Sequence, residues 1–241
     1  MSISALAILF VTSVVTSMVS GALGMAGGMI LLAVMTFVLS ANDVVPLHGL
    51  VQLASNTTRT LAFMRHVRWT IFAIYAPCAG LGLAAAAWVW TGTFTWLKPA
   101  VGSFILLFLL WQKLAPERFA PPVWVYAPAG LVVGALSMFI GATGPLLAPF
   151  FLRDDFDKEE IIATKAACQL FLHSAKIPAF LAVGYDYLPH LPLVAALLVA
   201  VVIGTFTGKE LVERISKELF MTVLRAVLFV MAVQLVVSAL A

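Results

Sequence analysis

Long apolar segments alternate with short polar breaks along the whole chain. A helix that crosses a membrane needs about 20 residues, because each residue rises about 1.5 Å and the hydrocarbon core is about 30 Å thick. Most of the segments meet this length, whereas 27–40 and 144–152 do not. The pattern predicts an all-α integral membrane protein. The apolar segments run approximately 3–23, 27–40, 44–64, 70–90, 97–113, 123–140, 144–152, 159–182, 189–208 and 218–240.

The order of the segments repeats once along the chain. Five apolar segments are followed by five more, with the short segment second in each set. The dipeptide Gln-Leu at 52–53 recurs at 169–170, which is 117 residues later. We therefore expect one membrane domain made of two repeats of about five helical segments each, 1–115 and 122–241.

The distribution of basic residues indicates that the two repeats have inverted topology. Four loops hold nine of the fourteen Lys and Arg residues, and basic loops mark the cytoplasmic side of a membrane. Placing these loops together puts corresponding loops of the two halves on opposite sides, which defines an inverted repeat. We expect both termini outside and a location in the plasma membrane, such as the bacterial inner membrane. The four loops are 65–68, 113–122, 153–158 and 209–217.

Each short segment follows a glycine-bearing stretch, 21–28 in the first half and 134–144 in the second. A glycine-broken, re-entrant segment at membrane depth is tolerated where it is buried in protein or lines a watery cavity. Broken segments at matching places in two halves point to the binding site of a transporter. The alternative is that these glycines only let helices pack closely. On the first interpretation, the candidate binding residues at the turns are Gly27, Gly28, Thr143 and Gly144.

The third segment of each half carries a stripe of polar residues on an apolar background. The two stripes have the same spacing of 4, 4 and 3 residues, which places each of them on one face of a helix. We predict that both stripes contribute to a binding site. The stripes are His48, Gln52, Asn56 and Arg59 in the first half and Lys165, Gln169, His173 and Lys176 in the second, with Thr57 and Ser174 beside them.

Three of the stripe residues are cations, Arg59, Lys165 and Lys176, and all eleven acidic residues lie in or beside the polar breaks. A charge at the bilayer centre costs about 2.5–3.5 kcal/mol on insertion scales. The pattern favours a bound anion as the counter-charge. Helix N-termini after the glycine turns would add donors to such a site. The alternative is that these side chains snorkel to the membrane surface.

Composition excludes several classes of function. The chain is 63% hydrophobic and 10% charged, against about 25% charged in a soluble domain. The basic residues are scattered, so the net charge of +3 does not indicate a nucleic-acid partner. Cys78 and Cys168 lack the spacing of a metal site. No catalytic constellation is visible, so we expect neither an enzyme nor a cofactor nor a metal centre.

The sequence resembles the TauE/SafE sulfite exporters, within the four-toluene-sulfonate uptake permeases. The resemblance is carried by the glycine stretches 21–28 and 134–144, by Arg-His-Val-Arg-Trp at 65–69, and by the duplicated layout over almost the whole chain. It implies export or uptake of sulfite, an organosulfonate or a related sulfur oxyanion. Together with the stripes, it leads us to expect a membrane transporter of a small anion that works by alternating access.

Three other functions stay open at this point, and a membrane enzyme or assembly factor is the one with least support from the residues. A passive anion channel would share every feature above. A carrier of sulfur compounds that uses Cys168 as a thiol relay is a further alternative, because Cys168 precedes Gln169 of the second stripe. The expected partners are the small anion, membrane lipid and a coupling ion, for which the candidates are a proton and sodium.

Overall fold

The computed structural model describes residues 2–23, 27–90, 97–114, 121–151 and 155–212, and nine positions near the C-terminus. All secondary structure in these ranges is helical. The longer helices are α1 (Ile3–Leu23), α2 (Gly27–Val38), α3 (Ala41–Ala62), α4 (Trp69–Trp88), α5 (Leu97–Leu114), α6 (Tyr126–Ile140), α7 (Gly144–Phe151), α8 (Lys158–Ala182) and α9 (Leu191–Val212), with short 3-10 helices η1 (Met64–His66), η2 (Val123–Val125) and η3 (Leu188–His190).

Within the described ranges, four helical segments are long and apolar enough to cross a membrane. They confirm the predicted class, an all-α integral membrane protein. The predicted last segment, 218–240, lies outside the described residues apart from isolated helical positions, and the predicted loop 209–217 lies outside them beyond 212. The four candidate spans are Ile3–Ser20, Trp69–Trp88, Val123–Ile140 and Leu188–Thr207.

Two helices are too short to cross a membrane, as the sequence predicts. α2 has 12 residues and α7 has 8. At about 1.5 Å per residue they reach about 18 Å and about 12 Å, well below the hydrocarbon thickness of about 30 Å. α7 follows Gly141, which has a left-handed φ of 81°. Neither short helix can therefore reach from one membrane surface to the other.

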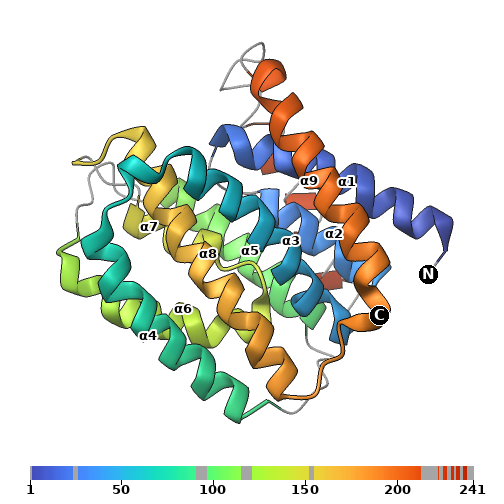
Figure 1. Ribbon diagram of the computed structural model, residues 1–241, viewed down its shortest axis with the longest axis horizontal. Helices are drawn as coiled ribbons and strands as arrows, with labels where there is room; N and C mark the ends of the chain where they lie inside the picture. Colours follow the sequence, from blue (N-terminus) through green and yellow to red (C-terminus); the bar gives the residue numbers. More distant parts are fainter. Residues whose placement is uncertain are drawn as a thin grey trace.

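Helices α3 and α8 form the centre of the molecule and run antiparallel. Tyr185, just after α8, contacts Asp43 in the first turn of α3, and Arg68, just after α3, contacts Glu160 in the first turn of α8. α1 packs on α9, and α4 packs on α6. Figure 1 shows α1 and α9 together on one side, α4 and α6 together on the other, and α3 and α8 between them.

Glycines set how closely the flanking helices approach. A Cβ on Gly82 of α4 would overlap the carbonyl oxygen of Leu131, and a Cβ on Gly134 of α6 would overlap that of Ala79. Each of these glycines therefore lies directly against the backbone of the other helix. Such close approach lets van der Waals packing hold helices together where lipid supplies no hydrophobic driving force. The glycine-packing interpretation of the sequence thus holds for α4 and α6.

We expect Gly82→Ala to destabilise the protein, because the added methyl group would force α4 and α6 apart. Overpacking of this kind costs about 1–3 kcal/mol. The matched control is Gly80→Ala on the same helix, where the new Cβ would lie 3.5 Å from the Phe171 ring in ordinary contact. Thermal unfolding of the two variants in detergent measures the difference. Equal unfolding temperatures would show that the α4–α6 contact does not limit stability.

Candidate functional site

The two predicted polar stripes are buried in the centre of the protein. All eight stripe residues are at most 8% exposed, and Lys176 is 1% exposed. They reach this position because α3 packs on α8 and each helix turns its polar face inward. The three cations therefore do not extend to the surface, so the snorkelling alternative does not describe this structure. Polar side chains in a lipid-facing protein are held inside in this way because exposing them to hydrocarbon is costly.

A small cavity of about 40 Å³ lies between the stripes. A cavity needs about 10–15 Å³ to hold one water molecule, so this one has room for a group of a few atoms. No acidic side chain occurs among the described residues that line it. The lining comprises Ser20 of α1, Gly28 and Met29 of α2, His48, Gln52, Asn56 and Arg59 of α3, Ala142 and Gly144 around the start of α7, and Lys165, Ala166, Gln169 and His173 of α8.

Arg59 is held along its own helix beside the cavity. Its Nε donates to the carbonyl oxygen of Ser55 at 3.1 Å, and one Nη donates to Oδ1 of Asn56 at 3.0 Å. Asn56 in turn donates from Nδ2 to the Gln52 carbonyl oxygen at 2.8 Å. These bonds fix the direction of the guanidinium group and keep its charge at the cavity wall. A positioned guanidinium is a strong donor to an oxyanion.

Two histidines face each other across the helix pair. The rings of His48 and His173 are 6.1 Å apart and edge-to-face. Nε2 of His48 lies 2.9 Å from the carbonyl oxygen of Gly28, so that nitrogen carries a proton and donates. Within the described part of the chain, Nδ1 of each ring is buried without a hydrogen-bond partner. A buried polar atom of this kind favours a water molecule or a ligand in the adjoining cavity.

The N-termini of both short helices reach the cavity. Gly28 lies in the first turn of α2, and Gly144 begins α7. The first N–H groups of a helix have no partner within the helix and carry partial positive charge. A Cβ on Gly28 would lie 3.0 Å from the Gln52 side-chain amide, so glycine lets the helix start approach the stripe. The two helix starts thus add positive potential to a cavity already lined by Arg59 and Lys165.

Lys176 lies beside this cavity rather than on its wall. Its Nζ donates to the carbonyl oxygen of Gly141 at 2.9 Å, in the left-handed turn before α7. Thr143, from the same turn, places its hydroxyl 3.5 Å from the side-chain amide of Gln169. Both residues therefore connect the start of α7 to the stripe on α8. This arrangement gives Lys176 a role in holding the turn.

Three predicted residues lie away from the cavity. The hydroxyl of Thr57 donates to the Leu53 carbonyl oxygen and that of Ser174 to the Leu170 carbonyl oxygen, each four residues back on its own helix. Ser174 is exposed. Gly27 packs against Thr16 of α1, where a Cβ would overlap backbone. Their proximity to the stripes in the sequence does not bring them into the lining.

A family comparison settles the class of protein to which this site belongs. The model of the sulfite exporter TauE/SafE family matches residues 9–235. The chain belongs to the TauE/SafE family. No curated protein and no solved structure matches it. Membership makes the protein a membrane transporter rather than an enzyme, and it implies transport of sulfite or a related sulfur anion.

In this TauE/SafE protein, four lining residues were not among those predicted from the sequence. Ala142 and Ala166 are small neighbours of predicted residues, and Met29 follows Gly28. Ser20 comes from α1 and is 3% exposed. Its place directly before the stretch 21–28 was the available signal, since that stretch leads into α2. A serine in an apolar helix gives no further indication of the face it occupies.

We expect Lys176→Met to destabilise the protein while leaving α8 helical. The variant keeps most of the length of the side chain but leaves the buried carbonyl of Gly141 without its donor, which costs about 1–3 kcal/mol. Ser174→Ala is the matched control on the same helix, because that hydroxyl is exposed and bonded within its own helix. Thermal unfolding in detergent compares the two. No loss of stability in Lys176→Met would mean that the turn before α7 holds without this bond.

Proposed function

We propose that this protein carries a small sulfur oxyanion through the cavity between α3 and α8 by alternating access. The proposal rests on the composition of the cavity wall. It combines the cationic side chains of Arg59 and Lys165 with the N-terminal turns of α2 and α7. Sulfite and sulfonate groups offer several acceptor oxygens, which suit arginine, lysine and backbone N–H donors.

The size of the cavity supports a compact anion. A volume of about 40 Å³ accommodates about three water-sized spheres. Sulfite or another ion with few heavy atoms matches this space better than an aromatic sulfonate does. The cavity lies between the packed helices α3 and α8, so a larger substrate would require them to separate. We therefore place sulfite first among the candidate substrates and short organosulfonates second.

We assign separate roles to the residues at the site. Arg59 and Lys165 supply the charge that attracts the anion. Lys176 and Thr143 hold the start of α7 against α8, and so position the N–H group of Gly144. The hydrogen-bonding groups that orient the anion are the side chains of Gln52, Asn56, Gln169, His48 and His173 and the backbone at Gly28.

Alternating access in this proposal follows from an inverted repeat. In such a repeat α1, α3 and α4 correspond to α6, α8 and α9. The helix contacts support this correspondence: α1 packs on α9 as α6 packs on α4, and α3 packs on α9 as α8 packs on α4. The common spacing of 117 residues between the stripes supports it as well. Rocking of one half against the other would then expose the cavity to each side of the plasma membrane in turn. Both termini would lie outside.

The environment of Cys168 favours an anion carrier over a thiol relay. Its side chain is 0% exposed, and Cys168 is not among the residues that line the cavity. A relay thiol must reach its substrate as an accessible thiolate. We expect Cys168→Ser to keep anion flux. Flux measurements in proteoliposomes distinguish a carrier from a passive channel. The flux of a carrier saturates with sulfite concentration, and a proton or sodium gradient drives sulfite uphill.

We expect Arg59→Ala and Lys165→Ala each to weaken sulfite binding about 10- to 100-fold. A hydrogen bond to a charged group contributes about 1.5–3 kcal/mol, and each 1.4 kcal/mol is a factor of ten in affinity. Titration calorimetry of purified protein with sulfite, thiosulfate, sulfate, sulfoacetate and simple carboxylates measures both affinity and selectivity. Arg59→Lys, which keeps the charge but loses the planar fork, should bind with intermediate affinity.

Arg65→Ala is the matched control for Arg59→Ala. Arg65 lies in η1 just beyond α3 and is exposed, so its loss should leave affinity unchanged. Size-exclusion profiles and helical content of all variants establish that they insert and fold. Sulfite affinity that survives in both Arg59→Ala and Lys165→Ala would place the binding site elsewhere in the protein.

A further inference from the structure

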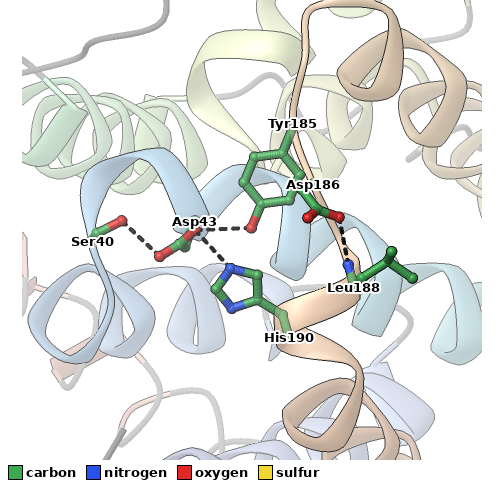
Figure 2. A network of polar contacts seen from close by, with 6 residues as sticks. All are labelled: Ser40, Asp43, Tyr185, Asp186, Leu188 and His190. Carbon is green, nitrogen blue, oxygen red and sulfur yellow. Dashed lines mark hydrogen bonds and ion pairs between the residues drawn. The ribbon is translucent and has the colours of Figure 1, made fainter.

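A cluster of polar contacts joins the two halves at one end of the α3–α8 pair. Oδ1 of Asp43 accepts a hydrogen bond from the Tyr185 hydroxyl at 2.9 Å and lies 3.3 Å from Nε2 of His190. Oδ2 accepts from the hydroxyl of Ser40 at 2.7 Å. Figure 2 shows the Asp43 carboxylate between Ser40 on its own side and Tyr185 and His190 on the other. We call the contacts of Asp43 with Tyr185 and His190 the Asp43 latch.

A second cluster joins the halves at the opposite end of the pair. Oε1 of Glu160 forms an ion pair with Nη2 of Arg68 at 2.7 Å, and Oε2 accepts from the backbone N–H of Asp157 at 3.2 Å. The backbone N–H of Arg68 also donates to Oγ1 of Thr164 at 2.9 Å. We call the contacts of Arg68 with Glu160 and Thr164 the Glu160 latch.

The two latches occupy equivalent places in the two halves. Asp43 and Glu160 are 117 residues apart, as are Arg68 and Tyr185, and this is also the separation of the polar stripes. Each acid lies in the first turn of its helix, three residues after the N-cap residue, Ser40 or Asp157. Each uses one carboxylate oxygen for its own helix start and the other for the opposite half.

The candidate anion cavity lies between the latches. On α3 the lining runs from His48 to Arg59, after Asp43 and before Arg68. On α8 it runs from Lys165 to His173, after Glu160 and before Tyr185. Because the helices are antiparallel, each latch ties the start of one cavity helix to the chain that follows the other. Opening one end of the cavity by separating α3 from α8 would break the latch at that end and leave the other in place.

The chemistry of the contacts suits reversible closure. The side chains of Asp43 and Glu160 are 22% and 17% exposed, and that of Arg68 is 51% exposed. Contacts this close to water contribute little free energy each, so a transport cycle can break and remake them. Burial, together with the hydrogen bond to Asp43, raises the pKa of Tyr185, which keeps the proton that its hydroxyl donates.

We propose that the Asp43 latch and the Glu160 latch are the two gates of the transporter, each closing one end of the passage to the cavity. The proposal rests on the alternating-access function above. It adds a pair of gates built from equivalent residues whose chemistry differs. One gate is an ion pair between arginine and glutamate, whereas the other is a tyrosine hydroxyl and a histidine on an aspartate. Weakening one gate should therefore favour the conformation that is open at that end.

The test measures access to the cavity from each side of the membrane. A reporter cysteine is placed on the cavity wall by Ala166→Cys, in a background with Cys78→Ser and Cys168→Ser. A small, charged, membrane-impermeant methanethiosulfonate reagent is applied to right-side-out and to inside-out vesicles, and the labelling rate is read from each side. Ser20→Cys is a second reporter on the same wall, used if Ala166→Cys reduces folding.

We expect opposite shifts from the two gates. Asp43→Asn with Tyr185→Phe should raise the labelling rate several-fold from one side and lower it from the other. Glu160→Gln should do the reverse. The matched controls are Asp186→Asn, whose carboxylate accepts only from the Leu188 N–H in Figure 2, and Glu159→Gln, an exposed neighbour of Glu160. Neither control should change the rates.

A charge exchange tests the contact itself. Arg68→Glu combined with Glu160→Arg should restore the labelling pattern that Arg68→Glu alone disturbs. The proposal is overturned if both gate variants shift labelling in the same direction, or if neither differs from its control. Labelling requires no substrate, so its outcome is independent of sulfite binding. Opposite shifts without sulfite binding would overturn the assigned substrate, while sulfite binding without the shifts would overturn the gates.

Discussion

The structure depends on the packing of two polar helix faces against each other. Each of α3 and α8 carries four polar residues on one face, and these side chains cannot be left in hydrocarbon without a large cost in free energy. Pairing the helices removes both faces from lipid at once and places the polar groups where they can hydrogen-bond. The remaining helices then present apolar surface outward. The pairing that buries these polar side chains also creates a polar cavity at the centre.

The elements around the cavity determine its packing and its electrostatic potential. Glycines at the α4–α6 contact bring helix backbones together and form a tight flank. The short helices α2 and α7 begin inside the protein, so their N-terminal turns lie at the site instead of at the membrane surface. Lys176 holds the turn at Gly141 and thereby fixes where α7 begins. Positive potential at the site thus arises from backbone as well as from side chains, which suits a family of sulfur-anion transporters.

The two ends of the central pair differ in chemistry although they are equivalent in position. An ion pair is weakened by salt at a water-exposed surface, whereas a tyrosine hydroxyl bonded to a carboxylate carries only one charge. In the gate proposal this difference gives the two sides of the membrane separate control over closure. The hydrogen bonds from the Ser40 hydroxyl to Asp43 and from the Asp157 N–H to Glu160 orient both acids, so the helix starts are pre-organised for contact with the opposite half.

Much of this protein follows from its sequence alone. Hydrophobic length determines which helices can span a membrane, and the helical period determines that the four residues of each stripe share a face, because both are properties of a single helix. The family is recognised from the sequence as well, since the family model matches residues 9–235.

Only the tertiary structure decides what each of those faces meets. Thr57 and Ser174 bond to their own helices, Lys176 reaches the turn before α7, and Ser20 enters the cavity wall from α1. The contact between Asp43 and Tyr185 joins residues that are 142 positions apart. Such outcomes depend on how helices cross and on the space between them. The periodicity of a single helix gives no information about either. The sequence therefore determines the faces, and the packing of α3 on α8 determines the site.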